Sequence, residues 1–308
     1  MGCLITISSF GTHPVEAYAP TFKKLQDSEM IHNLREKDIQ KKFIETSAGK
    51  IAYHETSGKS GPIILIHGNS CSKEYMIKQL DGLGLKYKMI ALDLPGHGES
   101  SNALNPSENY TLTGYARIVS EVIQKLNLQP VVVVGWSLGG HIALEMMAEN
   151  PELLQGVLIA SVPPFTPSEH VVKEAYLPTY STPLSMKQEP FTREDVKEYI
   201  TQGGIDLDRY PILIEASMRA HGLARLTMVN AVLSGQGVDE RKVAETSPIP
   251  LGIIMGSKEH VVNNDYIRSL KYANCCMMET LEGGHDCHWS HAEQFNQLVD
   301  RFAQGVSE

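Results

Sequence analysis

The stretch 131–147, VVVVGWSLGGHIALEMM, constrains the fold of this 308-residue chain most. Its four valines predict a strand buried on both faces, and the residues after Ser137 fit a helix. A G-x-S-x-G turn between a strand and a helix predicts a nucleophile elbow, which exposes the Ser137 hydroxyl above the sheet. Gly135 and Gly139 leave room where a Cβ would clash. The alternative is an ordinary Gly-Ser connection, but both flanks favour a nucleophile.

Length and composition indicate one large α/β domain with an insertion. The chain has 27 Lys and Arg against 36 Asp and Glu, a formal net charge of −9 that disfavours a nucleic-acid partner. No apolar run is long enough for a transmembrane segment. Five cysteines at irregular spacing predict neither a disulfide framework nor a zinc site. We expect Cys275 and Cys276 to be core thiols in a reducing, cytoplasmic location. The oligomeric state stays open.

The first forty residues predict an N-terminal extension, either a weakly ordered arm or a helix packed on the outside. The segment 22–39 has partial helical spacing at Leu25, Ile31 and Leu34. The basic start of a secretory signal is absent. Gly2 and Cys3 fit an acylation pattern, so an acylated N-terminus stays an alternative to an unmodified one.

Strand-like and helix-like segments alternate over 41–162 and 247–308, which predicts a parallel sheet covered on both faces. The expected strands are 43–46, 51–56, 63–67, 89–92, 131–134, 157–160, 251–255 and 275–281, with helices at 112–126 and about 290–302. The segment 163–246 lacks a convincing strand. Thr192 opens a predicted helix over 193–200. We therefore expect a helical cap over the carboxyl ends of the strands.

A serine nucleophile needs a base, and in this arrangement the chain order is Ser, then Asp or Glu, then His. His285 is the candidate base, because it follows two glycines between the last strand and the last helix. His288 and His291 could together with it suggest a metal. Their spacing spreads them around a helix, so we expect neither a metal ion nor a cofactor.

The acid that orients the base should follow the preceding strand. Glu259 stands at that place, after the strand at 251–255. Asp265, in the following helix, and Asp286, beside the base, are the rival candidates.

Two backbone amides should stabilise the oxyanion, those of Leu138 and Asn69. The Asn69 side chain and Trp136 are candidate substrate contacts. In the cap the candidates are Phe165, Tyr176, Tyr180, Met218, Leu223 and Met228, with burial in the cap core as the alternative for each. Asp93 and His97 belong to a sharp turn that we interpret as structural.

Residues 43–303 resemble the α/β-hydrolase superfamily, because HG at 67, DLPGHG at 93, GWSLGG at 135 and GGH at 283 occur in that family's order. The resemblance implies an α/β-hydrolase fold with a mostly parallel eight-stranded sheet, helices on both faces and a helical cap. Ser137 stands where haloalkane dehalogenases and epoxide hydrolases carry Asp. Within the superfamily, HGNSCS, GWSLGGHIALEM and a Glu acid look like the serine-dependent N-acyl-homoserine lactonases.

This resemblance implies acyl transfer on a small-molecule ester or lactone, with metal-free opening of the lactone ring of quorum signals. A general carboxylesterase or a carbon–carbon bond hydrolase with the same triad is the first alternative. A ligand-binding receptor that turns over slowly is the second.

Overall fold

The computed structural model describes residues 18–178, 182–200 and 204–307, whose strands form one eight-stranded sheet of order β1-β2-β4-β3-β5-β6-β7-β8. The strands are β1 (Ile39–Thr46), β2 (Gly49–Thr56), β3 (Ser60–Ile66), β4 (Tyr87–Leu92), β5 (Val131–Trp136), β6 (Leu154–Ala160), β7 (Leu251–Gly256) and β8 (Cys275–Leu281). The pairs β1–β2 and β2–β4 are antiparallel, and every other neighbouring pair is parallel. The predicted fold class is confirmed.

The central strands are buried on both faces, as their unbroken apolar runs predict. In β5, Val131 and Val133 belong to one hydrophobic cluster, and Val132 and Val134 to the other. This alternation follows from the two-residue period of a strand. The sheet therefore separates two cores.

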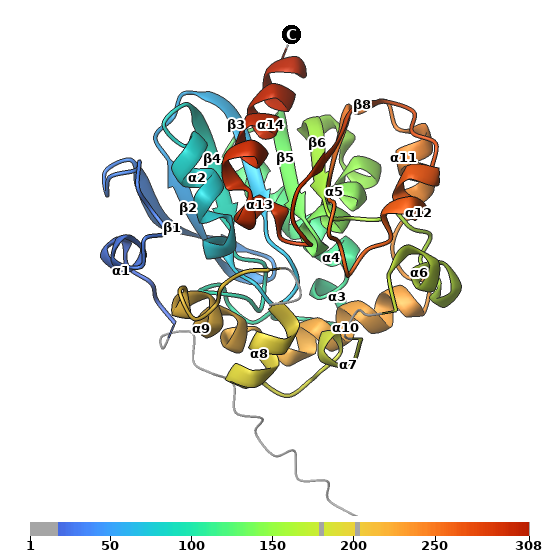
Figure 1. The fold of residues 1–308 in the computed structure, drawn as a ribbon, viewed down its shortest axis with the longest axis horizontal. Helices are drawn as coiled ribbons and strands as arrows, with labels where there is room; N and C mark the ends of the chain where they lie inside the picture. The colour runs from blue at the N-terminus through green and yellow to red at the C-terminus, as the bar shows by residue number, and fades with distance from the viewer. Residues whose placement is uncertain (1–17, 179–181, 201–203, 308) are drawn as a thin grey trace, which may run out of the picture.

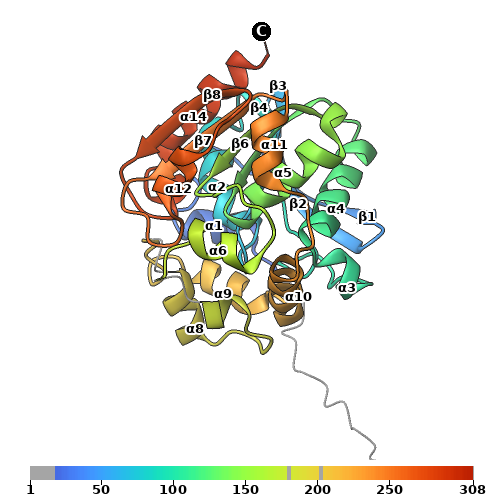
Figure 2. The same ribbon diagram turned by 90° about the vertical axis from the view of Figure 1, so that its right-hand side faces the viewer.

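The helices form a layer on each side of the sheet (Figures 1 and 2). On one side α2 (Ile77–Leu83) packs against α14 (Ala292–Gly305), which contacts the short α13 (Cys287–Ser290). On the other side α5 (Leu138–Glu149) contacts α4 (Leu112–Lys125) and α11 (Glu240–Thr246). Four short elements lie in the connections between these strands and helices: α3 (Pro106–Asn109), α12 (Asn264–Ser269) and the 3₁₀ turns η2 (Lys73–Met76) and η3 (Pro151–Leu153).

Between β6 and β7 the described residues contain helices and no strand of the sheet. Before α11 these helices are α6 (Glu169–Ala175), α7 (Thr182–Ser185), α8 (Arg193–Ile200), α9 (Pro211–Arg219) and α10 (Gly222–Leu233). In Figure 1, α7 to α10 lie together beyond one end of the sheet. The predicted start of α8 is correct, because Thr192 Oγ1 accepts from the Asp195 amide (3.1 Å) and the Asp195 carboxylate accepts from the Thr192 amide (2.7 Å).

The described part of the N-terminal segment packs on the core rather than forming a long outer helix. Only α1 (Phe22–Asp27) is helical. Leu25, Ile31 and Leu34 are nevertheless almost fully buried, in the same cluster as α2 and α14. The spacing of these apolar residues therefore identified buried positions, although most of the segment is not helical. The acylation candidates Gly2 and Cys3 lie outside the described residues.

The expectation of core thiols is wrong for Cys276, whereas Cys275 is partly buried against one of the two hydrophobic clusters. Cys275 is partly exposed and Cys276 is exposed, because β8 is the edge strand of the sheet. Cys71 and Cys287 are the buried thiols among the described cysteines.

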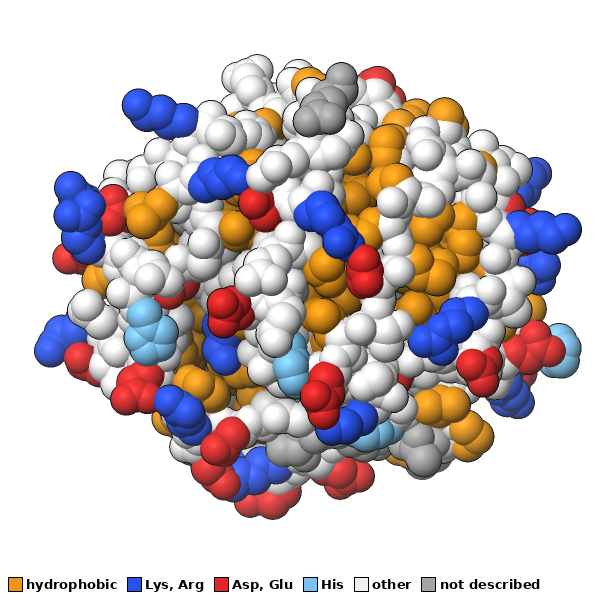
Figure 3. Space-filling view, turned by 45° about the horizontal axis from the view of Figure 1, so that its top comes forward, with side chains coloured by type: hydrophobic (Ala, Val, Ile, Leu, Met, Phe, Trp, Pro, Cys, Tyr) orange, Lys and Arg blue, Asp and Glu red, His pale blue; other side chains and the backbone are white. Residues whose placement is uncertain are grey.

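In the part of the chain that the structure describes, no helix is both long and apolar enough to cross a membrane. On the face shown in Figure 3, acidic and basic side chains are interspersed, with apolar side chains between them. No extended basic region is visible on this face.

Candidate active site

The Ser137 turn has the strained backbone that an exposed nucleophile requires. Ser137 has φ 51° and ψ −121°, an unusual conformation for a residue with a side chain. Its amide donates to the Ala160 carbonyl (3.0 Å), and its carbonyl accepts from the Gly140 amide (2.8 Å). A Cβ on Gly139 would lie 2.2 Å from the carbonyl oxygen of Ile66. The glycine therefore permits the close approach that holds Ser137 at the end of β5.

His285 and Glu259 form a hydrogen-bonded pair. His285 Nδ1 lies 3.1 Å and 3.2 Å from the two carboxylate oxygens of Glu259. Burial opposes ionisation of Glu259, but the His285 ring and the Val261 amide bring its pKa below the usual value. Because an ionised carboxylate only accepts, Nδ1 donates and Nε2 is left as the basic nitrogen.

The loops after β7 and β8 bring this pair together. The Ser257 amide donates to the Leu281 carbonyl (2.8 Å), and the Lys258 amide donates to the Gly283 carbonyl (2.7 Å). On the other side of the base, Trp136 Nε1 donates to the His285 carbonyl (2.8 Å). The imidazole is therefore held from three strand ends.

Neither rival carboxylate is hydrogen-bonded to the imidazole of the base. The Asp265 side chain is 96% exposed and pairs with Arg268. Asp286 is buried, but within the described residues neither of its carboxylate oxygens has a hydrogen-bond partner. Of the three candidates, only Glu259 hydrogen-bonds to His285.

The two expected oxyanion donors are available. The amides of Asn69 and Leu138 donate to no other group in the described part of the chain. Ser70, next to Asn69, has a positive φ of 59°, which turns the loop after β3 sharply. Ser137 Oγ itself forms no hydrogen bond within the described residues, a common state in structures without substrate.

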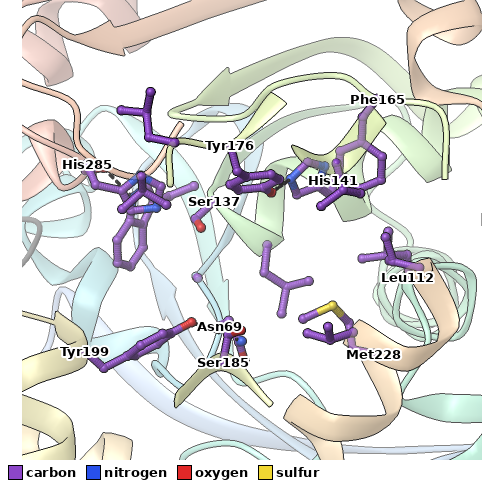
Figure 4. A pocket seen from close by; sticks show the side chains of 18 of the residues that line it. Asn69, Leu112, Ser137, His141, Phe165, Tyr176, Ser185, Tyr199, Met228 and His285 are labelled. Carbon is purple, nitrogen blue, oxygen red and sulfur yellow. Dashed lines mark hydrogen bonds between the residues drawn. The ribbon is translucent and has the colours of Figure 1, made fainter. Parts of the chain in front are cut away.

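A cavity of about 490 Å³ lies over Ser137 and His285 (Figure 4). One part of its wall is polar, with Asn69, Tyr176 and Tyr199. The apolar part of the wall includes Leu112, Leu138, Phe165, Val172, Met228, Val229, Val232 and Leu233. Between β6 and β7, α8 contributes Tyr199 to the polar part, and α6 and α10 contribute Val172 and Met228 to the apolar part.

Most of the expected substrate contacts line this cavity: Asn69, Trp136, Phe165, Tyr176 and Met228. Met218 and Leu223 are absent from its lining and pack against the hydrophobic clusters instead. Tyr180 lies outside the described residues.

Asn69 is also linked to α8, since its Nδ2 donates to the Tyr199 hydroxyl (3.2 Å). Sequence reasoning missed Tyr199, because no local pattern connects α8 with the loop after β3.

His141 and Glu240 were missed as well. His141 Nδ1 lies 2.8 Å from Glu240 Oε2, and its Nε2 lies 2.7 Å from the Tyr176 hydroxyl. His141 stands four residues after Ser137 in α5, and this spacing could have placed it on the same side of the helix. Glu240 had no such local signal.

Asp93 and His97 have structural roles. The buried Asp93 carboxylate accepts from the Lys73 ammonium (2.7 Å) and from the Glu99 amide (2.9 Å). His97 is fully buried beside His67. In the described ranges, no group of three His, Cys, Asp or Glu side chains is arranged to hold a metal ion.

Comparisons with known proteins agree with this architecture. A sequence model of the alpha/beta hydrolase fold matches residues 61–180. The protein YisY of Bacillus subtilis, of the AB hydrolase superfamily, is 24% identical over 282 residues, which span 85% of this chain and 98% of YisY.

Among solved structures, the N-acyl homoserine lactonase AidH complexed with N-butanoyl homoserine is 31% identical, with a TM-score of 0.80. The match covers 87% of this chain and 98% of that one. An esterase from Exiguobacterium antarcticum is 20% identical with a TM-score of 0.71, covering 86% of this chain and all of that one, and supports the fold alone.

Proposed function

Since the chain belongs to the α/β-hydrolase superfamily, we propose that it hydrolyses N-acyl-homoserine lactones with Ser137, His285 and Glu259 as its triad. The hydrogen bond between His285 and Glu259 above the Ser137 turn carries this proposal.

The proposed reaction is acyl transfer. His285 Nε2 takes the proton of Ser137 as Oγ attacks the lactone carbonyl, and the Asn69 and Leu138 amides bind the oxyanion. When the ring C–O bond breaks, His285 returns the proton to the leaving alkoxide, which stays attached to the acyl group. Water activated by His285 then attacks the acyl-enzyme and releases the open hydroxy acid and free Ser137. Glu259 stabilises the imidazolium throughout.

Two observations favour an acyl lactone over other esters. The cavity joins a polar region at Ser137 to an apolar region that suits a short acyl chain. AidH, to which the chain is 31% identical, is described as a lactonase of this substrate class.

A series of N-acyl-homoserine lactones of increasing chain length tests the proposal, with ring opening followed by proton release. We expect kcat/KM to rise with chain length and then level off, because each buried methylene contributes about 0.8 kcal/mol until the cavity is full. Simple p-nitrophenyl esters of matched length serve as the comparison, and Ser137→Ala as the inactive control. Much faster cleavage of p-nitrophenyl butyrate than of every lactone would indicate a general carboxylesterase.

A carbon–carbon bond hydrolase and a slow receptor remain the alternatives. A β-diketone substrate panel identifies the first. A stoichiometric burst with p-nitrophenyl butyrate and no steady turnover identifies the second.

A further inference from the structure

A second His–carboxylate pair adjoins the cavity and takes no part in the proposed triad. His141, near the start of α5, places its two ring nitrogens between the Glu240 carboxylate and the Tyr176 hydroxyl, at 2.8 Å and 2.7 Å. Glu240 is fully buried and His141 nearly so. Figure 4 shows the Tyr176 ring between His141 and Ser137, with its hydroxyl at the His141 end.

Glu240 acts as the acceptor in this pair. Its Oε2 also faces the Phe165 amide, which donates to it at 3.3 Å, so this oxygen receives two N–H groups. Burial raises the pKa of Glu240, while His141 and the Phe165 amide lower it. Once Glu240 is ionised, Nδ1 of His141 must carry the proton that joins them.

The direction of the next hydrogen bond follows. A neutral imidazole with its proton on Nδ1 has a lone pair on Nε2, which can only accept. The Tyr176 hydroxyl therefore donates to His141, and its oxygen keeps only acceptor capacity for other groups.

The backbone of Tyr176 is fixed independently. Tyr176 forms an isolated antiparallel bridge with Val262, and the Leu177 amide donates to the Val261 carbonyl (2.8 Å). The Val261 amide donates to Glu259 (2.9 Å). The segment that follows the candidate acid thus also positions Tyr176.

We propose that Glu240 and His141 are positioning residues that hold the Tyr176 oxygen as a hydrogen-bond acceptor, which selects substrates with an N–H on the carbon next to the scissile carbonyl. This inference rests on the proposed function for the identity of the natural substrate, but its test does not need lactones.

Two p-nitrophenyl esters that differ only at this position measure the effect of the N–H group on the rate of hydrolysis. p-Nitrophenyl N-butanoylglycinate carries it, and p-nitrophenyl 4-oxoheptanoate replaces it by a methylene in a chain of equal length. The measured quantity is the ratio of their kcat/KM values at pH 8, after division by the rates of hydroxide-catalysed hydrolysis.

For the unaltered protein we expect a ratio of about three to ten in favour of the glycinate, the contribution of one hydrogen bond. Tyr176→Phe should bring the ratio close to one. In Glu240→Gln the side-chain amide can donate to Nδ1, which moves the imidazole proton to Nε2 and turns the Tyr176 O–H toward the cavity. The ratio should then fall to one or below.

Met228→Leu is the matched control, because it changes the apolar wall of the same cavity and should keep the ratio of the unaltered protein. General damage to the cavity would slow both esters together. Equal ratios in the unaltered protein and Tyr176→Phe, or an unchanged ratio in Glu240→Gln, would overturn the inference. Failure to open any lactone, with the expected ratios on these esters, would instead reject only the proposed function.

Discussion

Two carboxylates near the candidate base differ in what the fold lets them do. Asp286 follows His285 directly, but its carboxylate forms no hydrogen bond within the described residues, whereas Glu259 lies 26 residues away and bonds to the imidazole. The backbone hydrogen bonds between the loops after β7 and β8 make this difference. Distance along the chain is therefore a poor guide to which carboxylate acts on the base.

Glu259→Gln should lower kcat by on the order of 10²- to 10⁴-fold on any accepted ester, because the amide keeps the shape but loses the charge that stabilises the imidazolium. Asp265→Asn, at the exposed rival carboxylate, is the matched control and should change kcat by less than about twofold. Steady-state kinetics with a p-nitrophenyl ester measures both. A large effect at Asp265 and a small one at Glu259 would refute the assignment of the acid.

At the scale of elements, a buried cation connects the helical segment between β6 and β7 to itself and, through Ser70 Oγ (3.4 Å), to the loop after β3. Arg225 of α10 is fully buried and forms no salt bridge in the described ranges. Its guanidinium donates to the carbonyls of Lys187 (2.9 Å) and Glu189 (2.8 Å), and stacks on Phe191 at 3.8 Å. Burial lowers its pKa to about 10. The guanidinium thus links α10 to the segment before α8.

Arg225→Met should destabilise the protein by about 3 kcal/mol, because it leaves these carbonyls without a buried donor. Arg193→Met, an exposed arginine at the start of α8, is the control and should change stability by less than about 0.5 kcal/mol. Urea denaturation measures both. Equal midpoints for the two variants would show that Arg225 does not stabilise the packing of α10 on the segment before α8.

At the scale of the whole molecule, stability should depend on pH through Asp286. Burial raises the pKa of this carboxyl to about 7, against an ordinary value near 4. Between these values the native state keeps a proton that the unfolded chain has released. The free energy of unfolding therefore falls as the pH rises through this window.

Asp286→Asn should remove this dependence. Relative to the variant, the unaltered protein should lose up to about 1.4 kcal/mol of stability for each pH unit between pH 4 and 7. Urea denaturation at several pH values gives the slope of the unfolding free energy against pH for each protein. The contributions of other titrating groups cancel when the two slopes are subtracted. Asp265→Asn is the exposed control and should keep the slope. Parallel curves for the unaltered protein and Asp286→Asn would contradict the assigned ionisation.

Local sequence patterns were enough to predict most of the strands and helices and the candidate nucleophile. The apolar runs of β5 and β7, the capping box at Thr192 and the glycines around Ser137 each act within a few residues. Strand propensity, capping and backbone sterics are local in origin, so these features could be predicted before any tertiary contact was known.

Local patterns in the sequence predicted the strands, the Ser137 turn and a short set of candidate acids and bases. Only the tertiary structure decided that β8 is an edge strand, which exposes Cys276, and that Glu259 rather than Asp286 reaches His285. It alone also joined His141 to Glu240, 99 residues away in the chain. Burial and hydrogen-bond partners depend on which distant segments meet, and no local pattern encodes that.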